Sequence, residues 1–171
     1  VTGFPIEVYP MPTATGTTST SPHWIRQADI FADMPLDTID TDLATVERTE
    51  GDLIHIHVRP GAKLTVDGFA KVLKARKTLA RDTPAGVIAI VPDDIDFELA
   101  IMNVDHYAGG NASAFTKVFA IVTCTNFHKQ LCALYTAFFK TPFPLRVFDD
   151  EAAARAWVLE HLAPGGSQCG L

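Results

Sequence analysis

The sequence predicts an α/β fold: a small open mixed sheet of about five strands, a β-hairpin followed by βαβαβαβα, with about four helices. Short apolar runs alternate along the chain with segments whose apolar residues recur at helical spacing. Two of these runs, at 117–124 and 145–148, flank a helical segment, and such an arrangement predicts a right-handed parallel crossover. Near the start, the runs 43–48 and 53–58 are separated by Glu50-Gly51-Asp52, a turn that predicts a hairpin.

The first helix and the central strand follow the hairpin. Thr65 is a good N-cap, and the residues after it place apolar side chains on one face and charged ones on the other. Asp67 and Lys71 lie four residues apart on the charged face, where they form a favourable pair. Residues 85–91 are continuously apolar, which predicts a central strand covered on both faces.

A second helix is predicted for residues 95–107. Asp93 and Asp94 precede it as candidate N-caps, and Gly109-Gly110 is a signal for its C-terminal end. Its apolar residues fall on one stripe, as expected for a helix that covers a sheet.

The last two helices surround the strand at 145–148. The first of them, predicted for 126–140, begins at a cap formed by Thr125 or Asn126 and ends before Pro142. The second opens at Asp149 and ends near residue 162.

These elements divide the chain into three parts. Residues 1–37 are rich in Pro, Thr, Ser and Gly, and we expect a flexible arm that ends in an acidic wrapping segment. Residues 38–163 form the folded domain, and residues 164–171 form a disordered tail. The apolar anchors of the wrapping segment need a surface to cover, and the helix at 126–140 is one candidate.

Composition excludes several classes of protein. A net charge of −6 argues against a general nucleic-acid binder, because phosphate contacts need a basic surface. No apolar run approaches the ~20 residues that span a bilayer, and no leader pattern opens the chain. The three cysteines form no CxxC pair and no disulfide framework, which fits a reducing compartment. A cytoplasmic location is therefore expected.

Several short motifs give the chain a family resemblance. They are Val58-Arg59-Pro60-Gly61-Ala62, Ala75-Arg76, Ala120-Ile121-Val122, Phe138-Phe139-Lys140-Thr141-Pro142, and Val147-Phe148-Asp149-Asp150-Glu151-Ala152-Ala153 leading to Ala156-Trp157. With these motifs and this order of elements, residues 43–162 resemble the STAS-like superfamily, the anti-sigma-factor-antagonist fold. More narrowly, they look like its bacterial STAS/SEC14-like members of unknown function, often labelled SpoIIAA-like.

The resemblance implies an open mixed sheet with helices packed on it. Signalling members of the superfamily carry an Asp-x-Ser phosphorylation switch in the loop after the third strand. Residues 91–96 occupy that place here and contain no Ser or Thr. The usual kinase-driven switch is therefore not expected, although Asp93 or Asp94 could imitate the charge of a phosphate.

Two groups of residues suggest metal or acid–base chemistry. His55 and His57 point to the same side of one strand, a spacing that can chelate a metal with a carboxylate as third ligand. The alternative is a pair of polar residues on a half-exposed sheet face or at a dimer contact. Asp93, Asp94 and Asp96 lie after a strand, where open α/β sheets often bind ligands. Helix capping explains these acids without a ligand.

The helix at 126–140 carries the other candidate ligand-binding residues. Thr125 and Asn126 lie at its start, where backbone N–H groups can hold an anion, although capping accounts for them equally well. One apolar stripe carries Phe127, Leu131, Leu134 and Phe138. A second stripe carries His128, Cys132, Tyr135 and Phe139, so the helix is apolar on more of its surface than one sheet contact requires. The second stripe could line an apolar pocket, form a homodimer surface, or pack against the wrapping segment.

We therefore expect a non-enzymatic regulatory or binding module that binds a protein partner or a small apolar ligand. It would use no cofactor, no catalytic residue and no resident metal. One alternative is a metal- or carboxylate-dependent enzyme that uses His55, His57, Asp93 and Asp94. Another is a structural homodimer, formed through the sheet edge or the helices.

Overall fold

The computed structural model describes residues 37–109 and 111–163. The predictions of a flexible arm, an acidic wrapping segment and a disordered tail fall on residues 1–36 and 164–171, outside the described residues. They stay predictions.

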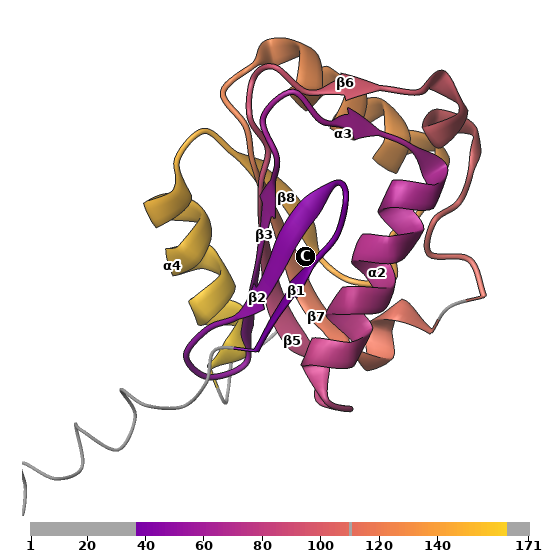
Figure 1. The fold of residues 1–171 in the computed structure, drawn as a ribbon. Coiled ribbons are helices and arrows are strands. Elements are labelled where there is room, and N and C mark those ends of the chain that lie inside the picture. The colour runs from indigo at the N-terminus through magenta and orange to yellow at the C-terminus, as the bar shows by residue number, and fades with distance from the viewer. Residues whose placement is uncertain (1–36, 110, 164–171) are drawn as a thin grey trace, which may run out of the picture. The chain divides into compact units, whose positions relative to one another are not determined.

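One mixed sheet forms the centre of the domain (Figure 1). Its six strands lie in the order β1-β2-β3-β5-β7-β8. The antiparallel pairs β1–β2 and β2–β3 form one side, and β3, β5, β7 and β8 continue in parallel. The strand bounds are Thr38–Asp40, Ala44–Arg48, Leu53–Val58, Ala85–Ile90, Thr116–Val122 and Leu145–Phe148.

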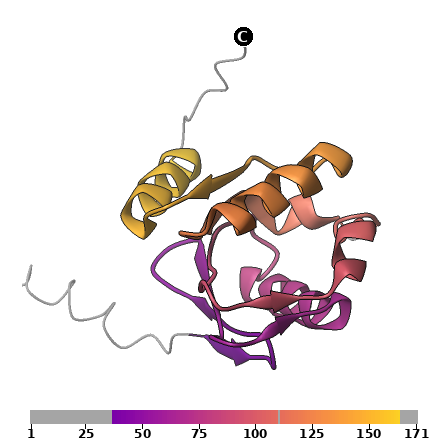
Figure 2. The ribbon, with the colours of Figure 1, turned by 90° about the horizontal axis from the view of Figure 1, so that it is seen from above.

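Three α-helices cover the two faces of this sheet. Helices α2 (Val66–Ala80) and α3 (Asn126–Phe138) lie on one face, and α4 (Glu151–Leu162) lies on the other (Figures 1 and 2). The predicted fold class is confirmed. The predicted counts were slightly wrong, because the main sheet has six strands and the described residues form three α-helices.

Local capping chemistry begins each of these helices. The hydroxyl of Thr65 accepts a hydrogen bond from the Gly68 N–H at 3.0 Å, and the hydroxyl of Thr125 accepts one from the His128 N–H at 3.3 Å. The carboxylate of Asp150 does the same for α4, one residue later than predicted. Each cap satisfies a backbone donor that the first helical turn leaves free.

The predicted helix at 95–107 was wrong. Asp96–Phe97 is instead a short strand, β6, which pairs in parallel with β4 (Lys63–Leu64), and Leu99–Asn103 is a 3-10 helix, η2. The backbone hydrogen bonds of this stretch go to a segment more than thirty residues earlier in the chain, which no local pattern reveals. Asp93 and Asp94 are exposed and cap no α-helix.

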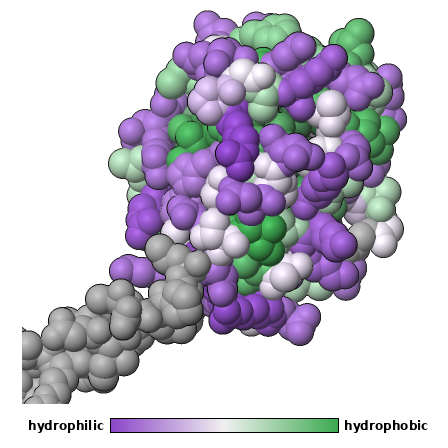
Figure 3. Space-filling view, viewed as in Figure 1, coloured by the Kyte–Doolittle hydropathy of each residue, from purple (hydrophilic) through white to green (hydrophobic). Residues whose placement is uncertain are grey.

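The outer surface is ordinary for a folded domain. The face over β1, β2 and α2 is mainly hydrophilic, with smaller apolar patches (Figure 3). On α2, Lys71 forms the predicted pair with Asp67 at 3.0 Å and a second one with Asp42 at 3.0 Å. Over residues 37–109 and 111–163, no helix has the length and hydrophobicity to cross a membrane.

The close approach of α4 to β5 depends on Gly86. A Cβ at this position would lie 2.5 Å from Cγ1 of Val158 and 2.9 Å from Cδ1 of Leu162. In most strands a Gly→Ala change stabilises the fold by roughly 0.5–1 kcal/mol. Gly86→Ala should instead lower the free energy of unfolding by about 1–3 kcal/mol, because it overpacks this contact.

Chemical denaturation of Gly86→Ala measures this change, and the same substitution in a Val158→Ala background is its control. The loss should shrink in that background, where the nearest clashing methyl group is absent. An equal loss in both backgrounds would show that the contact with α4 is not the cause.

Candidate functional site

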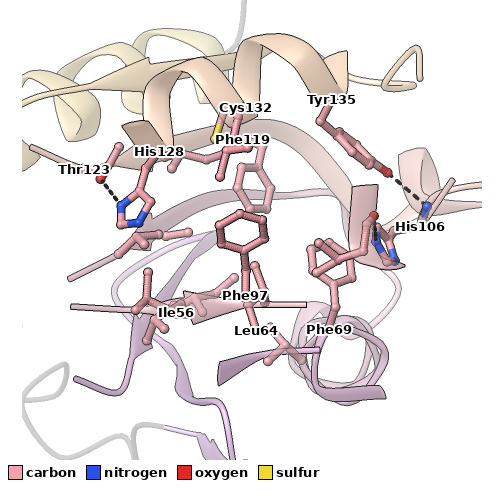
Figure 4. Close-up of a pocket in the computed structure, with 18 of the residues that line it drawn as sticks. Ile56, Leu64, Phe69, Phe97, His106, Phe119, Thr123, His128, Cys132 and Tyr135 are labelled. Carbon is pink, nitrogen blue, oxygen red and sulfur yellow. Dashed lines mark hydrogen bonds between the residues drawn. The ribbon is translucent and has the colours of Figure 1, made fainter. Parts of the chain in front are cut away.

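A cavity of about 200 Å³ lies between α2, α3 and the sheet. The connection from residue 91 to 107, here called the wall segment, closes another side. Apolar side chains dominate the lining, and Figure 4 shows how they face one another across the space. The principal ones are Ile56, Leu64, Phe69, Ala89, Phe97, Ile101, Phe119, Ile121 and Leu131.

Two hydrogen-bonded contacts hold α3 over the cavity. Near its N-terminus, Nδ1 of His128 lies 3.2 Å from the hydroxyl of Thr123, and both side chains are buried. Near its C-terminus, the hydroxyl of Tyr135 accepts a hydrogen bond from the His106 N–H at 3.0 Å and donates one to the Val104 carbonyl at 3.3 Å. The helix is therefore tied to β7 at one end and to the wall segment at the other.

Of the four residues of the second stripe, His128, Cys132 and Tyr135 line the cavity (Figure 4). Phe139 does not, but its ring packs 5.1 Å from the ring of Tyr135. The first stripe is divided: Phe127, Leu134 and Phe138 are 55%, 49% and 73% exposed, whereas Leu131 lines the cavity. The helix thus turns most of its more polar stripe inwards and leaves most of its apolar stripe in solvent.

The tyrosines and the cysteine of the lining are neutral at neutral pH. Burial raises the pKa of the Cys132 thiol and of the Tyr135 and Tyr107 hydroxyls, so these groups keep their protons. The hydroxyl of Thr136 bonds to carbonyls of its own helix, and Nε2 of His106 lies 2.9 Å from the Ile101 carbonyl. Protein partners therefore engage most of the polar lining.

Arg76 is the exception, and our sequence reasoning missed it. It comes from α2, is 2% exposed and lines the cavity. Its Nη2 donates to the Thr116 hydroxyl at 2.6 Å, and its guanidinium lies 4.7 Å from the centre of the Phe119 ring. The sequence did hold a signal: Arg76 follows Val72 by four residues and precedes Leu79 by three, so it falls on the buried stripe of the helix.

His55 and His57 lie on the sheet face that α4 covers, away from the cavity. Nε2 of His55 is 3.8 Å from a carboxylate oxygen of Glu151, and Nε2 of His57 is 3.0 Å from one of Glu47. The centres of the two rings are 5.9 Å apart, but the nearest carboxylate is a different residue for each ring. In the part of the chain that the structure describes, no three His, Cys, Asp or Glu side chains gather in a metal-binding arrangement.

The remaining candidates do not converge on the cavity either. Asp93 and Asp94 are exposed in the wall segment, and Asp96 accepts a hydrogen bond from the Phe97 N–H. Thr125 caps α3, and Asn126 is exposed in its first turn. Their assignment as ligand-binding residues stays a prediction.

Comparisons with known proteins show what the chain is similar to. A family model described as SpoIIAA-like matches residues 55–159. A solved structure that matches is an uncharacterised protein of the DUF3478 family, with a SpoIIAA-like fold, from Shewanella loihica PV-4. It is 19% identical over 70% of this chain and 98% of its own, with a TM-score of 0.46. No curated protein matches the chain.

The surroundings of His55 predict how stability depends on pH. Burial lowers the pKa of His55, and the carboxylate of Glu151 opposes this only in part; His57 and Arg155 lower the pKa further and Glu47 raises it. The folded protein therefore favours neutral His55. Below about pH 6.5 the unfolded chain binds a proton more readily, so stability should fall as pH falls towards the lowered pKa of the folded state.

Replacing His55 by Gln should flatten this decline, by at most about 1.4 kcal/mol per pH unit. Urea denaturation between pH 7.5 and 5.5 measures it, in a range where most carboxylates stay ionised. The matched control is His57→Gln, which removes an exposed imidazole from the same strand and leaves His55 in place. If His55→Gln keeps the slope of the unmodified protein, the neutral state of His55 does not contribute to stability.

Proposed function

The chain belongs to the SpoIIAA-like family, and we propose that it is a non-enzymatic binding module that holds a small apolar ligand beneath α3. The family match confirms the resemblance predicted from the sequence. The observation that carries the proposal is the cavity of about 200 Å³ with its mainly apolar lining.

The size of the cavity argues for an occupant. Protein interiors contain few voids larger than a water molecule, and an engineered apolar cavity of roughly 150 Å³ stays dry and binds benzene. Apolar walls that face one another across this space lack the contacts that close packing would give them. A ligand with an apolar body would supply these contacts and remove the walls from water.

The polar residues outside the cavity fit this function better than catalysis. His55 and His57 lie on the opposite face of the sheet, where His55 is 3.8 Å from its nearest carboxylate and His57 is 3.0 Å from a different one. The loop at residues 91–96 contains no Ser or Thr, so ligand binding, not phosphorylation at that loop, would be the regulatory input. A cytoplasmic location stays the prediction of the sequence.

A second candidate function is self-association through α3. The side chains of Phe127, Leu134 and Phe138 are exposed on the same helix at spacings of seven and four residues, and grouped large apolar residues on a surface are typical of contact surfaces. A homodimer through this stripe would also cover the outer wall of the cavity.

The ligand proposal predicts binding of 1-octanol, a neutral apolar probe. We expect a Kd on the order of 0.1 mM from the affinity that each ligand atom can supply. Amide chemical shifts should change at the lining residues Ile95, Ile121 and Cys132. Cys132→Phe should abolish these changes, because it fills the cavity from α3.

The control for this variant is Ala133→Phe, which adds the same ring to the next residue, on the exposed side of α3. It should bind octanol as the unmodified protein does. Octanol binding that survives Cys132→Phe, or shift changes confined to the outer stripe, would refute the cavity as the site.

The self-association candidate predicts a concentration-dependent mass. Sedimentation velocity from about 10 µM to 1 mM should show a dimer, since the exposed stripe offers apolar area for a contact. Phe138→Ser should shift the equilibrium towards monomer, whereas Ala133→Ser should not. A monomer throughout this range would remove the candidate and leave the ligand proposal untouched.

A further inference from the structure

Arg76 is the only Lys, Arg, Asp or Glu among the residues that line the cavity, and its surroundings leave its charge without an anion. Among the ion pairs of residues 37–109 and 111–163, none includes Arg76. Its Nε is the sole buried side-chain nitrogen or oxygen of these residues that lacks a hydrogen-bond partner. A buried charge with neutral neighbours is costly, because water no longer solvates it.

The neighbours that Arg76 does have compensate only in part. Thr116 supplies one neutral acceptor, and Phe119 supplies a ring face. Burial lowers the pKa of Arg76, and the Tyr107 phenol opposes this, but a guanidinium remains charged in proteins. An anionic acceptor beside Nε would accept the hydrogen bond that Nε lacks and would also balance the positive charge of the guanidinium.

We propose that the ligand is a small amphipathic acid, with an apolar body in the cavity and a carboxylate at Arg76. The inference rests on the proposed function and names its ligand class. The apolar wall made by Phe97, Phe119 and Leu131 accepts the body, and the guanidinium of Arg76 accepts the carboxylate. An apolar cavity of roughly 150 Å³ binds benzene, so a volume of about 200 Å³ suits a body of about six to eight carbons.

The test compares three probes with eight carbons in all that differ in the head group: octanoate, 1-octanol and octylammonium. In calorimetric titrations at pH 7.5, octanoate should bind about tenfold more tightly than octanol, the usual gain from a charge-assisted hydrogen bond. Octylammonium should bind more weakly than octanol, because its charge repels the guanidinium. Phenylpropionate, an aromatic acid of similar size, separates an aromatic from an aliphatic body.

Arg76→Met tests the residue itself. It removes the charge and keeps an unbranched apolar side chain, so the preference for octanoate over octanol should disappear while the octanol affinity changes less than about twofold. The control is Lys74→Met, which removes an exposed charge from the same helix and should keep the preference. If Arg76→Met does not fold, the ¹⁵N-Nε resonance of Arg76 in the unmodified protein gives the same answer, because it should shift with octanoate and not with octanol.

The possible failures are distinct. If none of the probes binds, the proposed function is wrong and this inference falls with it. If octanol and octanoate bind equally and the Arg76 Nε resonance does not move, the cavity binds apolar ligands. The proposal that the ligand is an acid with its carboxylate at Arg76 is then wrong. If Arg76→Met binds octanoate as before and only loses stability, Arg76 serves the fold through Thr116 and not the ligand.

Discussion

Helix α3 is anchored over the sheet at both ends, and this constraint creates the cavity. The Thr123–His128 contact fixes its first turn to the end of β7, and the hydroxyl of Tyr135 fixes its last turns to the wall segment. Between these anchors the helix lies over the cavity and contributes His128 and Cys132 to its lining (Figure 4). Polar contacts are directional, so they can hold a helix at a distance that apolar packing alone would close.

The two faces of the sheet differ in how closely the helices pack on them. On one face α4 lies close against β5, where Gly86 leaves no side chain between them, and Val158 and Ala154 are fully buried. That face has the close packing of an ordinary core. On the other face α2 packs on the strands, but α3 and the wall segment leave a gap above Ala89 and Ile121. The close packing on the α4 face stabilises a domain whose other face contains the cavity.

The cavity also has an uneven distribution of charge. Most of its polar lining is neutral and bonded to protein groups, while Arg76 keeps a charge with no anionic partner among the described residues. A single buried charge in an apolar surround orients whatever binds there, because a low dielectric strengthens its attraction for an acceptor. The same charge would be a liability in a cavity with no ligand.

The sequence by itself determined the elements whose signals are local. The strands at 53–58 and 145–148, the hairpin before the first helix, and the Thr65 and Thr125 caps all follow from side-chain alternation and from the donors that a helix start leaves free. Only the tertiary structure decided that 91–107 is a wall and not a helix, since Asp96–Phe97 finds its backbone partners at Lys63–Leu64. It also decided which stripe of α3 faces inwards. Periodicity shows that a side chain can be buried, but its partner comes from residues far away in the chain, and so does the space left between them.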